Sequence, residues 1–176
     1  MTAAVEIGRY SIVSAAPSAA VTIARLQSEA FEKPWREEDV RALLSGPGAV
    51  GYIAYVGQLA AGYVIARSTG EEAELLSIGT SPQYRRKGIG LALLKQLEMK
   101  LQADGTTKLF LEVNATNTAA IKLYMRERFR KIGTRKLYYK SVSGKRSDAL
   151  VLRKMLDYGA ADGVAGAVSH PVRLEA

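Results

Sequence analysis

The alternation of apolar and polar residues along the chain predicts a mixed β-sheet with helices on both of its faces. Strands are expected at residues 9–14, 50–56, 59–67, 74–80, 108–114, 130–140 and 149–154, where apolar runs are bounded by turn residues. Apolar residues have helical spacing at residues 17–30, 36–44 and 117–128, and in a long segment that ends at Gln102. This mixture of elements predicts an α/β (α+β) fold around a sheet of about seven strands.

Length and composition fit one globular domain. The 176 residues, 48% of them hydrophobic, are enough to bury a core, and we assign residues 1–156 to this domain. Residues 157–176 are rich in Ala and Gly and are predicted to form a flexible tail. No apolar run approaches the ~20 residues of a membrane span, the N-terminus does not resemble a signal peptide, and cysteine is absent. We therefore expect a cytoplasmic protein without disulfides or thiolate metal sites.

The positive charge is concentrated in the second part of the chain. Residues 1–70 hold six Lys/Arg and six Asp/Glu, so residues 71–176 supply the whole net charge of +8. A basic segment of this kind can bind nucleic acid, a ribosome-like surface or a polyanionic cofactor. For most of the cations from Arg126 onward we favour a solvated face, and we expect no direct binding of nucleic acid.

The most informative stretch joins a buried strand to a long helix through a basic turn. The strand at residues 75–80 ends at Ser81-Pro82, because Pro82 has no N–H for a ladder. Glycines and cations then occupy the start of the helix, in the sequence Arg85-Arg86-Lys87-Gly88-Ile89-Gly90. Free backbone N–H groups, room for close approach and the helix dipole make such a turn suited to phosphate. The stretch lacks the GxxxxGK[ST] of a Walker loop and is too short for a dinucleotide fingerprint.

Two further residues are candidates for acid–base chemistry. Glu112 is the one carboxylate on the apolar strand 109–114, where it can take a proton from an amine directly or through water. Tyr124 follows Asn117 by seven residues and lies on the same stripe of the next helix. Taken alone, a solvent-facing glutamate and a core tyrosine are the plainer interpretations. His170, the only histidine, lies in the predicted tail, so a histidine-based triad is not expected.

Two motifs together resemble the GCN5-related N-acetyltransferase (GNAT) superfamily, and within it the ribosomal-protein-alanine N-acetyltransferases. They are R-x-x-G-x-G from Arg85 to Gly90, and LEVNATNTAAIKLY, which ends at Tyr124. The resemblance covers roughly residues 33–156 and includes two shorter segments, Lys33-Pro34-Trp35 and Arg135-Lys136-Leu137-Tyr138-Tyr139. The sequence departs from the family pattern at three positions, where Arg, Ser and Gly are replaced by Asn114, Thr116 and Arg128. The first of these replacements can alter the substrate groove.

The resemblance implies a set of site residues. Glu112 is implied as the general base, and Tyr124 as the general acid that protonates the leaving thiolate. The backbone of Ile78, Gly79 and Thr80 is implied to receive the acetyl group and the pantetheine arm of acetyl-CoA. The other implied CoA contacts come from the pyrophosphate loop and the following helix, at Arg86, Lys87, Gly88, Ile89, Gly90, Leu91 and Asn117. Trp35, Tyr138 and Tyr139 are candidates for the walls of an acceptor groove, with core packing as the alternative for the two tyrosines.

The implied activity is acetyl-CoA-dependent transfer of an acetyl group to a protein N-terminal amine, with the N-terminal alanine of small-subunit ribosomal protein eighteen as the preferred acceptor. An α-amine, with a pKa of about 7.7–8.0, loses its proton near neutral pH more easily than a lysine at about 10.4. Transfer to a protein lysine, a polyamine or an antibiotic is the alternative, and a non-enzymatic module that binds CoA or the ribosome is a third interpretation. We expect a monomer without a metal and without membrane contact, and a contact with the ribosome stays open.

Overall fold

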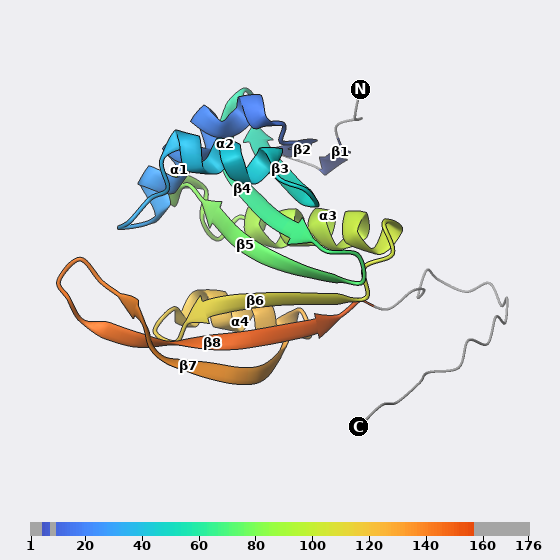
Figure 1. The fold of residues 1–176 in the computed structure, drawn as a ribbon. Coiled ribbons are helices and arrows are strands. Elements are labelled where there is room, and N and C mark those ends of the chain that lie inside the picture. The colour runs from blue at the N-terminus through green and yellow to red at the C-terminus, as the bar shows by residue number, and fades with distance from the viewer. Residues whose placement is uncertain (1–4, 8–9, 157–176) are drawn as a thin grey trace, which may run out of the picture.

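One eight-stranded sheet runs through the protein in the order β1-β2-β3-β4-β5-β6-β8-β7 (Figure 1). The structure is a computed structural model, and it describes residues 5–7 and 10–156. The strands are β1 (Val5–Ile7), β2 (Tyr10–Ser14), β3 (Ala49–Val56), β4 (Leu59–Ser68), β5 (Glu72–Thr80), β6 (Lys108–Asn114), β7 (Arg130–Lys140) and β8 (Arg146–Met155). Neighbouring strands are antiparallel except for β5 and β6, which are parallel.

The α-helices lie on both faces of this sheet, two on each face (Figure 1). In the described part of the chain they are α1 (Ala20–Ala30), α2 (Glu37–Ser45), α3 (Ile89–Ala103) and α4 (Thr118–Arg126). Successive side chains of a strand point to opposite faces, so β4 contributes to two cores. Tyr63 and Ile65 pack with α1 and α2, whereas Val64 and Ala66 pack with α3 and α4.

The predicted fold class is confirmed, and each expected strand and helix is present with shifts of a few residues at its ends. Two short 3-10 turns, η1 (Pro17–Ala19) and η2 (Pro82–Tyr84), precede α1 and the turn before α3. Strand β1 was not predicted, and β8 begins earlier than expected because its first residues pair with the end of β7, as in Arg146 with Lys140. Strand pairing of this kind depends on the partner strand as much as on the local sequence.

The end of α4 shows the cost of one departure from the family pattern. Arg128 has a φ of 68°, in the left-handed region that favours glycine. The turn is closed by Phe129 N, which donates to Tyr124 O at 3.0 Å, and by Arg128 N, which donates to Met125 O at 3.2 Å. This is the geometry of a Schellman motif, in which glycine normally takes the left-handed position. Arg128 therefore holds a strained backbone that a glycine would relieve.

The predicted tail at residues 157–176, with His170, lies outside the described residues, and so do residues 1–4 at the start of the predicted domain. None of the helices that the structure describes has both the length and the apolar character needed to cross a lipid bilayer.

Candidate active site

The two parallel strands at the centre of the sheet separate halfway along their length. Pairing between β5 and β6 runs from Glu72–Lys108 to Leu75–Leu111 and ends there. Each strand continues with its outer neighbour, since β5 pairs with β4 as far as Thr80, and β6 pairs with β8 as far as Asn114. The sheet is therefore split into two arms that open toward the carboxyl ends of β5 and β6 (Figure 1). In open α/β sheets, ligands bind outside the carboxyl ends of the strands.

Backbone groups of β5 face this opening. Just after the strand, Ser81 N donates to Ala61 O of β4 at 2.9 Å. Because backbone N–H groups alternate in direction along a strand, those of Ile78 and Thr80 point away from β4, toward the opening. The register ends at Leu75, so within the described residues no β6 partner faces them. An extended ligand chain can therefore pair with this stretch as an added strand would.

The floor beneath these residues is fixed by buried polar contacts. The Tyr63 hydroxyl and Ser77 Oγ lie 2.6 Å apart, and Gln27 Nε2 donates to Ser77 Oγ at 3.1 Å. A Cβ on Gly79 would meet Tyr63 Cε1 at 2.7 Å and Phe31 Cε2 at 3.1 Å. Gly79 is therefore needed because two aromatic rings approach the backbone here, one from β4 and one from the loop after α1.

The basic turn before α3 adopts the shape expected of a phosphate site. Arg86 and Gly88 both have positive φ, at 62° and 83°, and their side-chain positions face solvent. Nothing lies within 4 Å of a Cβ built on Gly88, so open space borders the backbone there. Ala92 N makes the first bond of the helix, to Gly88 O at 3.0 Å. The N–H groups of residues 89–91 precede it and have no acceptor within the helix.

The start of α3 also lies against the end of β5. A Cβ on Gly90 would be 3.7 Å from Thr80 Oγ1, so the helix terminus and the strand terminus are adjacent. Free helix N–H groups, an exposed left-handed glycine and the cations Arg85 to Lys87 fit a pyrophosphate, while the free edge of β5 fits an extended arm attached to it. The residues present are therefore compatible with CoA. The assignment of the individual CoA contacts remains a prediction.

Glu112 lies on β6, beside the opening, and is ion-paired. Its Oε1 accepts a hydrogen bond from Arg135 Nη1 at 2.8 Å, and its side chain is 23% exposed. The hydrogen bond to this carboxylate is the main cause that raises the pKa of Arg135. The Arg135 guanidinium also lies 3.8 Å from the centre of the Tyr138 ring. The sequence motif included Arg135 but assigned it no role. Only the pairing of β7, β8 and β6 brings it to Glu112.

Two adjacent tyrosines of β7 border the same carboxylate. The rings of Tyr138 and Tyr139 pack edge to face with centroids 5.2 Å apart. The Tyr139 hydroxyl donates a long hydrogen bond of 3.4 Å to the backbone oxygen of Glu112. Tyr138 is exposed and Tyr139 is half-buried, and burial is the main cause that raises the pKa of Tyr139. Both residues are therefore accessible to an acceptor, and their role as groove walls stays a prediction.

A bulge in β7 sets these positions. Arg135 pairs with Ala149 and Tyr139 pairs with Ser147, so three residues of β7 lie opposite the single residue Asp148. Leu137, within the bulge, has a φ of 52°. Asp148 stabilises the bulge, because its carboxylate accepts hydrogen bonds from Leu137 N at 2.9 Å and from Lys136 Nζ at 3.1 Å. The first of these bonds is the main cause that lowers the pKa of Asp148.

Tyr124 lies on α4, on the other side of the opening from β5. It is buried, with 4% of its surface exposed, and packs edge to face on Phe129 with centroids 5.5 Å apart. Desolvation raises the pKa of Tyr124 to about 12, with a smaller contribution from its charge interaction with Tyr139. Among the described residues, no group forms a hydrogen bond with its hydroxyl. A protonated phenol without a protein acceptor is suited to donate to a ligand atom.

Asn117 and Asn114 organise the connection into α4. Asn117 Oδ1 accepts a hydrogen bond from Ala120 N at 3.2 Å and so caps the helix. Asn114 Oδ1 accepts from both Thr116 N and Thr116 Oγ1 at 2.9 Å. The predicted CoA contact of Asn117 would therefore come from its amide nitrogen, since its oxygen is used by the cap.

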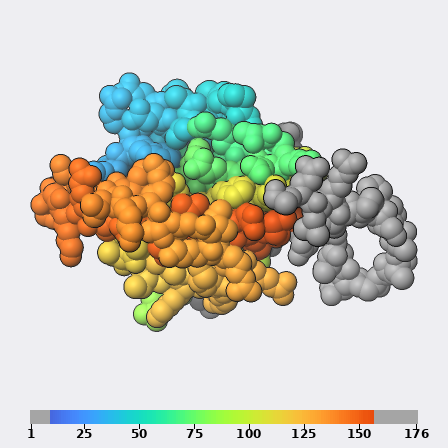
Figure 2. Space-filling model, turned by 60° about the horizontal axis from the view of Figure 1, so that its bottom comes forward, coloured from blue at the N-terminus to red at the C-terminus, as the bar shows by residue number. Residues whose placement is uncertain are grey.

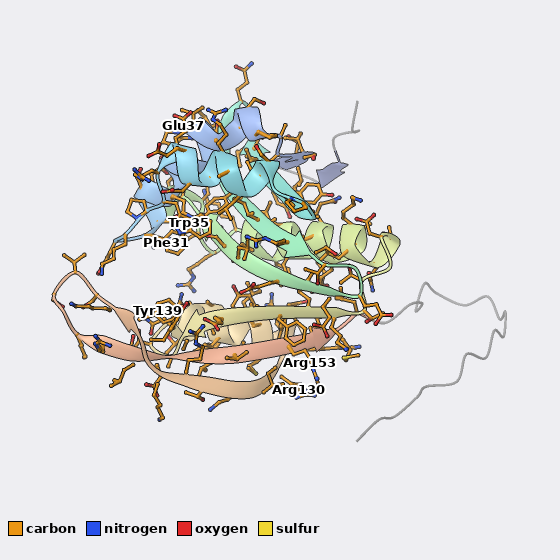
Figure 3. The ribbon with its side chains drawn as sticks, viewed as in Figure 1. Phe31, Trp35, Glu37, Arg130, Tyr139 and Arg153 are labelled. Carbon is orange, nitrogen blue, oxygen red and sulfur yellow. The ribbon has the colours of Figure 1, made fainter. Side chains whose placement is uncertain are left out.

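The loop between α1 and α2 bridges the two arms near the site. Lys33 Nζ donates to Lys140 O at 2.6 Å, and Val142 N donates to Glu32 Oε2 at 3.4 Å. Figure 3 shows Phe31 and Trp35 above the opening and Tyr139 below it. Trp35 is half-buried against the core of α1 and α2, whereas Phe31 is 42% exposed and contacts the face of Gly79. Phe31, which the sequence analysis did not select, is therefore the closer candidate for a groove wall.

A comparison with known families agrees with this geometry. The model of the Acetyltransferase (GNAT) family matches residues 20–129. The chain belongs to this family and is an acetyltransferase, and the family takes its acetyl group from acetyl-CoA.

Within the family, the chain is similar to two enzymes that are named as protein N-acetyltransferases. It is 34% identical over 128 residues to the [ribosomal protein bS18]-alanine N-acetyltransferase of Escherichia coli. The aligned residues make up 72% of this chain and 84% of that relative. It is 29% identical over 154 residues to N-alpha-acetyltransferase 50 of Danio rerio. Here the aligned residues make up 85% of this chain and 90% of that relative.

Solved structures give the same result for the fold. The crystal structure of the ribosomal-protein-S18-alanine N-acetyltransferase from Escherichia coli superposes with a TM-score of 0.80 at 28% identity, over 89% of this chain and 99% of that one. The structure of Arabidopsis thaliana NAA60 in complex with acetyl-CoA gives a TM-score of 0.73 at 20% identity, over 83% and 98% of the two chains. The second match supports the fold alone.

Proposed function

We propose that the protein transfers the acetyl group of acetyl-CoA to the α-amino group of a protein N-terminus. The observation that carries this proposal is the arrangement of Glu112, Tyr139 and Tyr124 where β5 and β6 separate. Tyr139 donates to Glu112 O at 3.4 Å and has a charge interaction with Tyr124, so it lies near both candidate residues. A carboxylate and a protonated phenol next to a free strand edge are the groups that acyl transfer to an amine requires.

Glu112 would remove the proton of the attacking amine, directly or through water. An α-amine with a pKa of about 7.7–8.0 is partly neutral at pH 7.5, so loss of one proton to a carboxylate is enough. A lysine side chain with a pKa of about 10.4 would be almost wholly charged at this pH. Arg135 orients the Glu112 carboxylate through its 2.8 Å hydrogen bond. This arrangement supports a terminal amine as acceptor.

Tyr124 would stabilise the sulfur that leaves. A phenol with a pKa of about 12 is a weaker acid than a thiol at about 8.5. Full transfer of its proton to the released thiolate would therefore be unfavourable by roughly three to four pKa units. The hydroxyl would instead donate a hydrogen bond to sulfur as negative charge develops there during cleavage of the carbon–sulfur bond, and the released thiolate would take its proton from water. The N–H of Thr80, which faces the opening, is placed to donate to charge on the acetyl oxygen.

Acetyl-CoA supplies the activated acetyl group, and we assign its binding to two parts of the chain. The backbone of Ile78, Gly79 and Thr80 would pair with the pantetheine arm. The pyrophosphate would lie on the helix start and the turn before it, formed by Arg86, Lys87, Gly88, Ile89, Gly90 and Leu91. Asn117 would add a contact from α4. The free N–H groups and the exposed Gly88 backbone support this assignment.

The acceptor we infer is the N-terminal alanine of small-subunit ribosomal protein eighteen. The similarity to the Escherichia coli enzyme of that name, at 34% identity, supports it. Phe31 on one arm and Tyr138 with Tyr139 on the other would form aromatic walls for an extended peptide backbone. Asn114 replaces a family arginine near this groove and can change which acceptor is preferred. The identity of the first acceptor residue should therefore be varied in the test.

A set of three matched peptides tests the proposal. The first begins with a free alanine, the second begins with serine or glycine, and the third is the alanine peptide with a formylated N-terminus and an internal lysine. Incubation with acetyl-CoA followed by mass spectrometry should show one acetyl group on the N-terminus of the first peptide and none on the third. Efficient acetylation of the formylated peptide would assign the protein to lysine acetylation instead.

A further inference from the structure

Three side chains form a row across the second arm of the sheet. Phe110 of β6 pairs with Arg153 of β8, and Arg153 pairs with Arg130 of β7. Directly paired residues carry their side chains on the same face of a sheet. Figure 3 shows Arg130 and Arg153 together at the end of β7 and β8 that lies away from Tyr139. The pairing places an aromatic ring and two guanidinium groups across about 10 Å of one sheet face.

The helices do not cover this face. The opposite face of β6 and β8 packs in the core with α4, through Leu109, Leu111 and Leu152, which alternate with Phe110 and Arg153. Helices α1 and α2 pack on β3, β4 and β5. Phe110 is half-buried, yet it belongs to neither of the two core clusters that the described residues form. Figure 2 shows β7 in orange and β8 in red at the surface when the bottom of the molecule is turned forward.

The charge of the row is uncompensated. Arg130 and Arg153 are both exposed, and no ion pair with either is formed in the part of the chain that the structure describes. Like charges directly opposite each other on paired strands destabilise a sheet. Glu74 of β5, which pairs with Phe110, is a carboxylate at the far side of the row from Arg130. Glu74 lies two strands from Arg153 and three from Arg130, so the end of the row that holds the two arginines is suited to an external anion.

Contrary to the expectation from the sequence that the protein does not bind nucleic acid directly, we propose that the face formed by Phe110, Arg153 and Arg130 binds single-stranded RNA. Arginines supply the contacts to phosphate, and the half-buried ring of Phe110 supplies a partly accessible surface on which an unpaired base can stack. The net charge of +8 gives the whole protein a field that attracts a polyanion. An acidic peptide could form ion pairs with the two arginines, but it would have no base to stack on the ring of Phe110, which lies between the arginines and the centre of the sheet.

The position of the row relates RNA binding to the active site. Phe110 precedes Glu112 by two residues on β6, which corresponds to about 7 Å along the strand. RNA on this face would therefore lie beside the candidate base, on the same side of the sheet. A protein acceptor that is itself associated with RNA could be held there while its N-terminus reaches Glu112.

Fluorescence anisotropy with a labelled single-stranded RNA of about 12 nucleotides tests the proposal, since comparable binding surfaces cover about 4–16 nucleotides. The variant Arg130→Gln/Arg153→Gln removes two cations. Each phosphate contact contributes about 0.7 to the slope of log K against log salt for a single strand, so the slope should fall by about 1.4 and the affinity at 0.1 M salt by about 25-fold. Phe110→Leu should weaken binding by about fivefold or more with little change in slope.

The double variant Lys122→Gln/Lys145→Gln is the matched control. It also removes two exposed cations, but one lies on α4 and the other in the turn between β7 and β8. It should change RNA affinity by less than about threefold, and thermal unfolding should show that all variants fold. Equal loss of affinity in the control would overturn the proposal, because binding would then follow net charge alone. Equal affinity for polyglutamate of the same length would overturn it too, in favour of an acidic protein partner.

Discussion

Arg135 Nη1 donates a hydrogen bond of 2.8 Å to Glu112 Oε1, while the same guanidinium stacks on the ring of Tyr138. The two side chains of the ion pair are 53% and 23% exposed. A pair this accessible to water contributes little to the free energy of unfolding. Its importance therefore lies in the orientation that it gives to the candidate base and to the neighbouring tyrosine.

Replacement of Arg135 by Gln should affect catalysis more than stability. The carboxylate of Glu112 would lose its orienting partner, and we expect kcat to fall about tenfold. The melting temperature should fall by no more than about 4 °C, because an exposed ion pair stabilises a domain of this size only weakly. Lys136→Gln is the control, because it removes the adjacent cation, which pairs with Asp148 instead. Equal losses of activity in both variants would show that charge near the site matters, and not the contact with Glu112.

Replacement of Tyr124 by Phe should remove the hydrogen-bond donor and keep the packing on Phe129. We expect kcat to fall about 10²- to 10⁴-fold, while the dissociation constant of CoA stays within about twofold. Tyr52→Phe, in the same core, is the control for loss of a tyrosine hydroxyl. A wild-type rate for Tyr124→Phe would mean that the residue serves only the core.

The raised pKa of Tyr124 also predicts the alkaline limb of the rate profile. A general acid acts in its protonated form, so its contribution is lost as pH rises through its pKa. Because that pKa is about 12, the rate of the wild-type enzyme should not decline from ionisation of Tyr124 below about pH 11. A decline with a midpoint near pH 9 that disappears in Tyr124→Phe would contradict the burial-based shift.

Replacement of Gly88 by Glu should place a side chain and a negative charge where the pyrophosphate is expected. We predict that the dissociation constant of CoA, measured by calorimetry, rises at least tenfold, or about 1.4 kcal/mol. Gly144→Glu is a close control, because Gly144 has a φ of 86° against 83° for Gly88 and both have open space beside them. Unchanged CoA affinity in a folded Gly88→Glu protein would remove the turn from the cofactor site.

Replacement of Arg128 by Gly should stabilise the protein. The left-handed conformation costs a residue with a side chain about 1–2 kcal/mol, and the greater freedom of glycine in the unfolded chain offsets about 0.4–1 kcal/mol of the relief. The expected gain is about 0.5–1 kcal/mol in the free energy of unfolding, measured with urea. Lys122→Gly, in the middle of α4, should instead lower the free energy of unfolding by a similar amount. A loss of stability in Arg128→Gly would show that the Arg128 side chain has a compensating role.

The strand β5, the basic turn and helix α3 could be predicted because their signals are local. Pro82 ends the strand, Gly88 permits the left-handed turn, and the spacing of leucines continues the helix. These signals lie within one short stretch of chain, so the sequence alone was sufficient to locate the candidate CoA site. Its individual contacts remain predictions.

The partners of Glu112 could not be predicted in the same way. The contact with Arg135 depends on the register of β7, β8 and β6, and on a bulge at Leu137 that Asp148 stabilises. The approach of Phe31 to Gly79 depends on how the loop after α1 crosses the sheet. No local pattern encodes such contacts between distant segments, since a shift of one residue in register moves every side chain of a strand to the opposite face of the sheet.

The proposed mechanism requires Glu112 to take a proton from an N-terminal amine, and the pH dependence of kcat/KM in Glu112→Gln tests this most directly. Glutamine keeps the size of the side chain but cannot accept the proton. The variant must then rely on amine that is already neutral, and for an α-amine this fraction rises steeply between about pH 7 and 8 and saturates above. The measurement uses a peptide with a free N-terminal alanine, saturating acetyl-CoA and the wild-type enzyme at each pH.

We predict that the rate ratio of wild type to Glu112→Gln is large at about pH 6.5 and shrinks severalfold by about pH 9, where an α-amine is neutral without help. Glu98→Gln, at a buried carboxylate that pairs with Lys154 away from the opening, should show no such trend. A rate ratio for Glu112→Gln that stays constant from about pH 6.5 to 9 would contradict the assignment of Glu112 as the base.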